Sequence, residues 1–239
     1  MQQRRARTLF LSVAACLGLM AFTALAAQAA NLEDGGKAAK FLVEKSAALA
    51  VGTTFEVTQV GTGTLLVPGR VDILCTKGVT TGLINSGADA SASGTFTGCT
   101  AWQPVTELGK SHVTKVACTV KEPIVAGGLA LPKLHEGASY VLLEQKEGVL
   151  GFTTIFLEGP ECPLTKENKL DGSVVGQIDK NDTVNPTLLF DHTIQKLFQT
   201  SGTQGDHLKF GAFEAFIDAE TTAKITGPAE DVGKTLGVC

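Results

Sequence analysis

The stretch KVACTVK at residues 115–121 alternates apolar and polar side chains along the chain. Val116, Cys118 and Val120 form the apolar set, and lysine and threonine occupy most of the positions between them. Successive side chains of a β-strand point to opposite faces of the sheet, so a period of two indicates one buried face and one wetter face. The stretch therefore predicts a strand at the surface of a β-domain.

The same alternation recurs along most of the chain after residue 50. Glycine, proline, asparagine and aspartate separate these runs at intervals of roughly 8–12 residues, which is typical of an all-β sandwich or barrel. We therefore predict an all-β fold, an antiparallel sandwich or flattened barrel, with its β-domain over residues 51–239. Further alternating runs lie at 55–58, 71–76, 154–158, 208–210 and 223–225.

Residues 31–50 are predicted to form a short N-terminal helix. Positions 37–50 contain no glycine or proline, and Phe41, Leu42 and Leu49 recur at helical spacing before Gly52. Because these apolar side chains would otherwise be exposed, we expect the helix to dock on a sheet edge or on one end of a barrel.

Three other segments have less regular patterns. Residues 86–98 are rich in small polar side chains, so we expect a loop that enters a strand near Gly94, although a strand of small residues is the alternative. Residues 186–199 fit a strand slightly better than a helix, because their larger apolar side chains alternate. Gly61-Thr62-Gly63 is expected to form a turn.

The first thirty residues have the organisation of a secretory signal peptide. Three arginines precede an uncharged run from Thr8 to Ala27, which closes on the small residues of Ala27-Gln28-Ala29. We therefore expect a secreted, periplasmic or cell-surface protein. An uncleaved N-terminal anchor is one alternative, and lipidation at Cys16 after Val13-Ala14-Ala15 is another.

Charge and aromatic content disfavour several classes of protein. Residues 1–30 hold three of the 20 lysines and arginines and none of the 24 acidic residues, so the remainder has a net charge of about −7. A nucleic-acid partner is not expected, because phosphate binding needs clustered cations. A single tryptophan and a single tyrosine argue against the aromatic girdles of an outer-membrane barrel. No second long apolar run follows, so no membrane span is expected after signal cleavage.

Five cysteines remain after the proposed cleavage, and all are disulfide candidates. Five cysteines allow 15 arrangements of two bridges, so the connectivity is open. We predict a Cys99–Cys118 bridge, because Cys99 ends a Thr-Phe-Thr run and Cys118 centres a neighbouring strand. The odd cysteine is expected to be a buried free thiol, with pairing between chains as the alternative. The candidates are Cys75, Cys99, Cys118, Cys162 and Cys239.

Several short motifs resemble those of secreted bacterial β-rich proteins over roughly two thirds of the chain. The resemblance implies an exported β-domain with a bridge near Cys99 and Cys118, and it implies no activity and no functional residues. The motifs are Phe96-Thr97-Gly98-Cys99, Cys118-Thr119-Val120, Glu161-Cys162-Pro163, Gly172-Ser173-Val174-Val175-Gly176 and Leu208-Lys209-Phe210-Gly211.

The sequence contains no pattern that predicts catalytic, cofactor-binding or metal-binding residues. No Gly-x-Ser-x-Gly occurs, and Ser111-His112 are mere chain neighbours. Three histidines, His135, His192 and His207, adjoin an acid, but adjacent strand residues face opposite sides. The polar segment 179–185 has oxygen ligands suited to calcium, yet a turn accounts for it equally well.

These observations favour an exported, non-catalytic protein that acts as an envelope, surface or assembly component. The alternative is an extracytoplasmic binding protein with an apolar cavity, lined by Leu65, Leu129 and their neighbours. A secreted hydrolase ranks third. The expected partner is accordingly another protein or a small apolar ligand, and no cofactor is expected.

Overall fold

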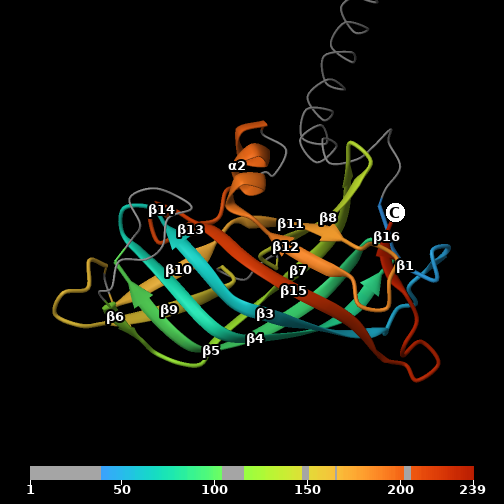
Figure 1. Cartoon of the computed structure of the whole chain (residues 1–239), viewed down its shortest axis with the longest axis horizontal. Helices are drawn as coiled ribbons and strands as arrows, with labels where there is room; N and C mark the ends of the chain where they lie inside the picture. Colours follow the sequence, from blue (N-terminus) through green and yellow to red (C-terminus); the bar gives the residue numbers. More distant parts are fainter. Residues whose placement is uncertain (1–38, 104–115, 147–150, 165, 202–205) are drawn as a thin grey trace, which may run out of the picture.

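The computed structural model describes residues 39–103, 116–146, 151–164, 166–201 and 206–239. Strands dominate this part of the chain, and its only helix is α2, His192–Ser201 (Figure 1). The prediction of an all-β fold is therefore confirmed. The strands are β1 Phe41–Val43, β2 Ala47–Ala48, β3 Thr54–Val67, β4 Val71–Ser86, β5 Asp89–Trp102, β6 Val116–Val120, β7 Ile124–His135, β8 Ala138–Glu144, β9 Thr153–Glu158, β10 Glu167–Asp171, β11 Ser173–Asp179, β12 Thr187–Phe190, β13 Lys209–Phe210, β14 Phe213–Glu214, β15 Phe216–Gly227 and β16 Leu236–Val238.

Eight antiparallel strands close into a barrel. Their order is β5-β4-β3-β15-β12-β11-β8-β7, and the pairing of β5 with β7 closes the ring. Closure removes the free edges that an open sheet would expose. Of the two architectures that the sequence allowed, the barrel is therefore the one that this sheet forms, with further strands outside it.

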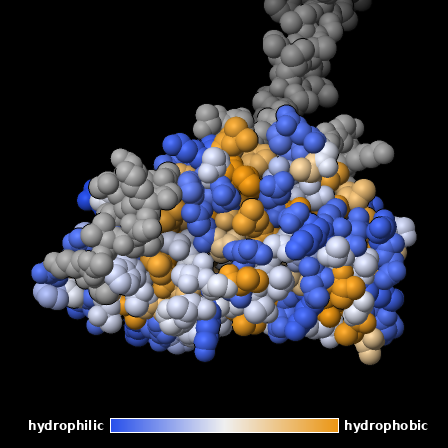
Figure 2. Space-filling model, in the orientation of Figure 1, coloured by the Kyte–Doolittle hydropathy of each residue, from blue (hydrophilic) through white to orange (hydrophobic). Residues whose placement is uncertain are grey.

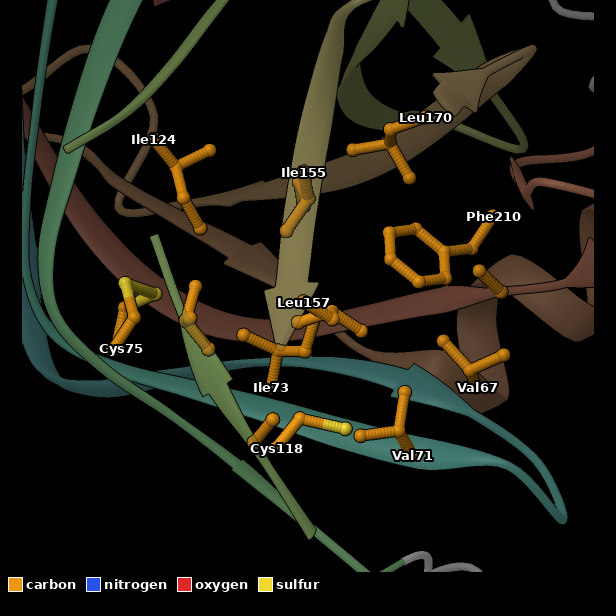
Figure 3. Packing of buried hydrophobic residues seen from close by; sticks show 14 of the residues in the cluster. Val67, Val71, Ile73, Cys75, Cys118, Ile124, Ile155, Leu157, Leu170 and Phe210 are labelled. Carbon is orange, nitrogen blue, oxygen red and sulfur yellow. A yellow bond between two sulfur atoms is a disulfide. The ribbon is translucent and has the colours of Figure 1, made fainter. Parts of the chain in front are cut away.

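The longest barrel strands continue beyond the ring into a second layer. Strands β3, β4 and β5 have 14, 16 and 14 residues, and their outer halves face a sheet extension ordered β6-β9-β10-β13-β14. Figure 3 shows Ile73, Leu157 and Phe210 between these layers, and all three are almost fully buried. They belong to the largest of the three hydrophobic cores among the described residues.

A small sheet, ordered β16-β1-β2, lies at the opposite end from β6 and β9 (Figure 1). The predicted helix over residues 37–50 is therefore wrong for the described residues 39–50. Phe41, Leu42 and Val43 pair with Val238, Gly237 and Leu236 in antiparallel register, and this distant partner is invisible to local periodicity. The segment does dock at one end of the barrel, as expected, but it does so as short strands and not as a helix.

Two other segments differ from their predictions. Residues 89–93 belong to strand β5 and not to a loop, because they pair with β4 on one side and, from Ala90 onward, with β7 on the other. The segment 186–199 divides between β12 and α2. Asp191 ends the strand pattern, since its Oδ1 accepts hydrogen bonds from the N–H groups of Thr193 (2.7 Å) and Ile194 (3.2 Å) and so caps α2.

The predicted Cys99–Cys118 disulfide is wrong. Cys99 is bonded to Cys75, its partner across the β4–β5 ladder, and Cys118 is bonded to Cys162 in the segment after β9. Cys118 lies in β6, which pairs with β5 at Ala101, so a neighbour on the adjacent strand was mistaken for the bonded partner. Cys239 is free and exposed, so the expectation of a buried thiol is also wrong.

Some predictions fall outside the described residues. They are the signal peptide over 1–30, its two alternatives (an uncleaved anchor and lipidation at Cys16), and the Ser111-His112 pair. Among the residues that the structure describes, no helix has the length and apolar character needed to cross a membrane.

Candidate functional site

The interior of the barrel contains a cavity of about 210 Å³. Alternation along each strand sends every second side chain inward, so all eight barrel strands contribute to its wall. Strands β1 and β16 add side chains at one end. The lining residues are Phe41, Phe55, Val57, Gln59, Gly78, Thr80, Ile84, Ala92, Phe96, Ala130, Val141, Leu143, Ile178, Pro186, Thr187, Leu188, Phe190, Ile217, Ala219, Thr221, Ala223, Leu236, Gly237 and Val238.

The cavity wall is almost entirely apolar. Among the described lining residues, none carries a charge, and the polar side chains are Gln59 and three threonines. One of these, Thr221, donates a hydrogen bond from Oγ1 to the carbonyl of Leu188 at 3.1 Å. Binding pockets for small molecules commonly combine such an apolar lining with a few polar groups that orient the ligand.

Gln59 lies where strand β3 departs from regular pairing. The β3–β4 register shifts between Thr58 and Gly63, so Gly61-Thr62-Gly63 is an irregularity inside the strand and not the predicted turn. The Gln59 Nε2 donates to the carbonyls of Gly61 and Cys75, both at 2.8 Å. These bonds pair backbone oxygens near the irregularity and hold the amide in one orientation.

The β1–β16 sheet closes one end of the cavity. Phe41 and Val238 are buried and pack with Ile84 and Val141 of the barrel in a second hydrophobic core. Asn181 secures this sheet, because its Nδ2 donates to the Val238 carbonyl at 2.8 Å and its Oδ1 accepts from the Val238 N–H at 2.9 Å. The segment 179–185, considered above for calcium, thus supports the closed end.

Helix α2 covers a gap in the pairing of the barrel wall. Strand β12 pairs with β15 from Ala219 onward, and the backbone of Ile217 bonds instead to the side chain of Gln195. Gln195 is fully buried, and its amide donates to the Ile217 carbonyl at 2.5 Å and accepts from the Ile217 N–H at 2.9 Å. Because Ile217 lines the cavity, α2 stabilises this part of its wall.

His192 provides a second attachment of α2 to β15. Its backbone N–H donates to Asp218 Oδ1 and its ring Nδ1 lies against Asp218 Oδ2, both at 2.6 Å. Burial works against the charge on the neighbouring Asp191, but hydrogen bonds from Thr193 and Ile194 hold the pKa of Asp191 below its ordinary value. The helix start therefore contains a charged cap beside an Asp–His pair.

The inner face of α2 packs on β8 and β11. Phe198 is buried and meets the rings of His135 and Tyr140 edge-on, with centroids 5.1 Å and 5.0 Å apart. Burial, with a contribution from Glu136, raises the pKa of Tyr140. Figure 2 shows apolar side chains on the outer side of α2 as well, where Leu197 is 64% exposed.

The structure disperses the histidines considered above. The ring of His135 meets Phe198 of α2 edge-on, and His192 pairs with Asp218. His207 Nδ1 lies 3.6 Å from Glu214 Oε1 near the second layer. No group of three histidine, cysteine or acidic side chains suited to a metal occurs among the described residues. The ion-pair partner of His192 is Asp218 and that of His207 is Glu214, so neither histidine pairs with the acid that precedes it in sequence.

The residues expected to line a cavity do not line it. Leu65 packs against the second-layer core, and Leu129 pairs with Ser91 and Glu144 at the odd-numbered, outward positions of β7. The lining residues Phe55 and Val57 do lie in the predicted alternating run 55–58, so their shared face was visible in the sequence. That this face surrounds a space and not a filled core depends on the packing of all eight strands.

Comparison with models of known protein families, with curated proteins and with solved structures found no significant match. The candidate site therefore rests on the geometry of this chain.

Proposed function

We propose that this protein is an extracytoplasmic binding protein that holds one small apolar molecule inside its barrel. The single observation that supports this proposal best is the 210 Å³ apolar cavity, with no charged side chain among its described lining residues. Interiors of proteins are normally close-packed, and an unfilled space forfeits contacts on every wall. A ligand that restores those contacts would stabilise the folded state.

The volume of the cavity limits the size of the ligand. An engineered cavity of about 150 Å³ with aliphatic and aromatic walls stays dry and binds benzene. The present cavity is somewhat larger at about 210 Å³, so we infer a ligand such as a substituted benzene or a molecule of comparable bulk. A lipid with two acyl chains is too large for this space.

The two disulfides support an extracytoplasmic location, because such bonds persist in oxidising compartments. The predicted signal peptide points to the same compartment. The role favoured by the sequence, that of an envelope, surface or assembly component, stays a prediction, and a ligand-binding barrel is compatible with it.

The proposal is tested by the thermal stability of the protein with 4-ethyltoluene, an uncharged probe of suitable size. We expect the melting temperature to rise with probe concentration, because the probe binds only the folded state. Ala92→Leu places a larger side chain in the cavity and should abolish the rise.

Ser93→Leu is the matched control, because Ser93 is exposed on the same strand. It should leave the rise intact. A melting temperature that does not respond to the probe in the unsubstituted protein would contradict the proposed function.

A further inference from the structure

Resting on the proposed function, we propose that the ligand carries one neutral hydrogen-bond donor, a hydroxyl, which binds the Oε1 of Gln59. The rest of the ligand is apolar and extends toward the end closed by β1 and β16. The ligand class is therefore a small phenol or alcohol, and Gln59 is the residue that determines this specificity.

The hydrogen bonds of Gln59 fix which end of its amide is available. The two carbonyls that it contacts, those of Gly61 and Cys75, can only accept, so the amide NH₂ must face them. Both amide hydrogens are thereby used. Oε1 accepts no hydrogen bond from the described residues and remains a preoriented acceptor.

Two glycines make room for this oxygen, because neither has a Cβ at the position that the oxygen approaches. A Cβ atom at Gly63 would lie 2.9 Å from Gln59 Oε1, and one at Gly78 would lie 2.7 Å from it and 2.8 Å from a ring carbon of Phe96. Any larger residue at Gly78 would therefore crowd the oxygen and the ring together. Gly78, Phe96 and Gln59 all line the cavity, and a Cβ at Gly78 would meet both the oxygen and the ring. We infer that the oxygen faces the cavity.

The lining selects a neutral donor over a charged one. A carboxylate ligand would bring its own lone pairs to an oxygen that offers no proton. An ammonium ligand would be desolvated beside described lining residues that include no acid to neutralise it. A hydroxyl needs only the single acceptor that Gln59 supplies.

The position of Gln59 also sets the orientation of the ligand. Gln59 lies at the irregularity of β3, where the strand leaves the barrel for the second layer, whereas Phe55 of the same strand packs with Phe41 in the core at the closed end. A molecule with its hydroxyl at Gln59 therefore places its apolar part against Phe55, Ile84 and Val238.

The inference is tested with three probes of nearly equal shape: 4-ethylphenol, 4-ethyltoluene and 4-ethylbenzoate. Their dissociation constants are measured by calorimetry on the unsubstituted protein and on Gln59→Met, which keeps the length of the side chain and removes the acceptor. We expect Gln59→Met to shift the phenol-to-toluene ratio of dissociation constants about tenfold against the phenol. The benzoate should bind weakest to the unsubstituted protein.

Thr81→Val is the matched control, because Thr81 is exposed on β4 beside the lining residue Thr80. It should leave the ratio unchanged. Since Gln59→Met also removes two hydrogen bonds to backbone carbonyls, a second readout uses the unsubstituted protein. The ¹³C resonance of the Gln59 side-chain carbonyl should move with 4-ethylphenol and stay in place with 4-ethyltoluene.

The outcomes separate this inference from the proposed function. The inference is overturned, and the apolar binding site stands, if 4-ethyltoluene binds as tightly as 4-ethylphenol and the Gln59 resonance does not move. A ratio that changes with Thr80→Val instead of Gln59→Met, or tightest binding of the benzoate, also overturns it. If no probe binds, the proposed function fails and takes the inference with it.

Discussion

Glu144 shows how burial changes the chemistry of one carboxyl group at the end of β8. Burial raises the pKa of Glu144, the negative charge of Asp206 raises it further, and Lys133 opposes the shift. The folded protein therefore holds the Glu144 proton more tightly than the unfolded chain does. Consequently, the stability contributed by this group falls as pH rises from the ordinary pKa of glutamate through the raised one.

Glu144→Gln should increase the stability of the protein at pH 7, because an amide avoids the cost of burying a charge. Below the ordinary glutamate pKa the carboxyl is protonated in both states, so the difference from the unsubstituted protein should disappear there. Urea unfolding at several pH values measures this. Exposed Glu158→Gln removes the same charge and serves as the control, with little expected effect. Equal effects of both variants would contradict the interpretation.

Contacts of individual side chains were harder to predict from the sequence than the strands were. Gln59 directly follows the predicted alternating run 55–58, but nothing local indicates that its amide would pair with the carbonyl of Cys75 on the next strand. That contact requires the irregular register of β3 and β4, which depends on two strands together. Similarly, the partner of His192 is Asp218 in β15, which lies 26 residues further along the chain.

Helix α2 illustrates an element whose place in the fold depends on one buried side chain. Gln195 bonds both polar groups of the Ile217 backbone, which no strand pairs on that side. Gln195→Leu would leave a buried N–H and a buried carbonyl without these partners. We expect the free energy of unfolding to fall by about 2 kcal/mol, as measured by urea denaturation.

Leu197→Gln is a suitable control for α2, since Leu197 is 64% exposed on the same helix. It should change the free energy of unfolding by less than about 0.5 kcal/mol. Should Gln195→Leu prove as harmless as this control, the role given to Gln195 in the barrel wall would be wrong.

The disulfides connect elements across loops of different length. Cys75–Cys99 links residues 24 apart in sequence, and Cys118–Cys162 links residues 44 apart. If the bonds act mainly by restricting the unfolded chain, removing the first as a Cys75→Ala/Cys99→Ala pair costs about 3.5 kcal/mol and removing the second pair costs about 4 kcal/mol.

Calorimetric melting of the two double variants checks this order. The Cys75–Cys99 bond joins strands that the β4–β5 ladder already pairs, whereas Cys118–Cys162 holds β6 to the segment after β9. A much larger loss for the Cys75–Cys99 variant would show that loop closure does not dominate.

At the level of elements, period-two alternation predicted the strands well. The runs at 55–58, 71–76, 154–158 and 223–225 all fall in strands of the structure. Two of the failures involve long-range pairing: β1 pairs with β16, and the first part of β5 pairs with β7 in addition to its hairpin with β4. Local spacing gave a helix for the first and a loop for the second, because it carries no information on those partners.

The described part of the molecule is a barrel whose two ends are covered by different structures. Long strands extend one side of it into a second layer with a dense core, and the small β1–β16 sheet packs at the other end (Figure 1). The space between these cores remains open as the apolar cavity. Period-two alternation predicted the all-β class, but closure of the ring requires residues 90–96 of β5 to pair with β7, and the first part of this segment was predicted to be a loop.

The most direct test of the central claim is a crystal structure of the protein under xenon pressure. Xenon enters dry apolar cavities large enough to hold it. We predict xenon density inside the barrel, between Phe55, Phe96 and Phe190. A barrel interior filled by side chains, or occupied by a hydrogen-bonded cluster of ordered water with no xenon, would contradict the claim that this protein has a binding cavity for an apolar ligand.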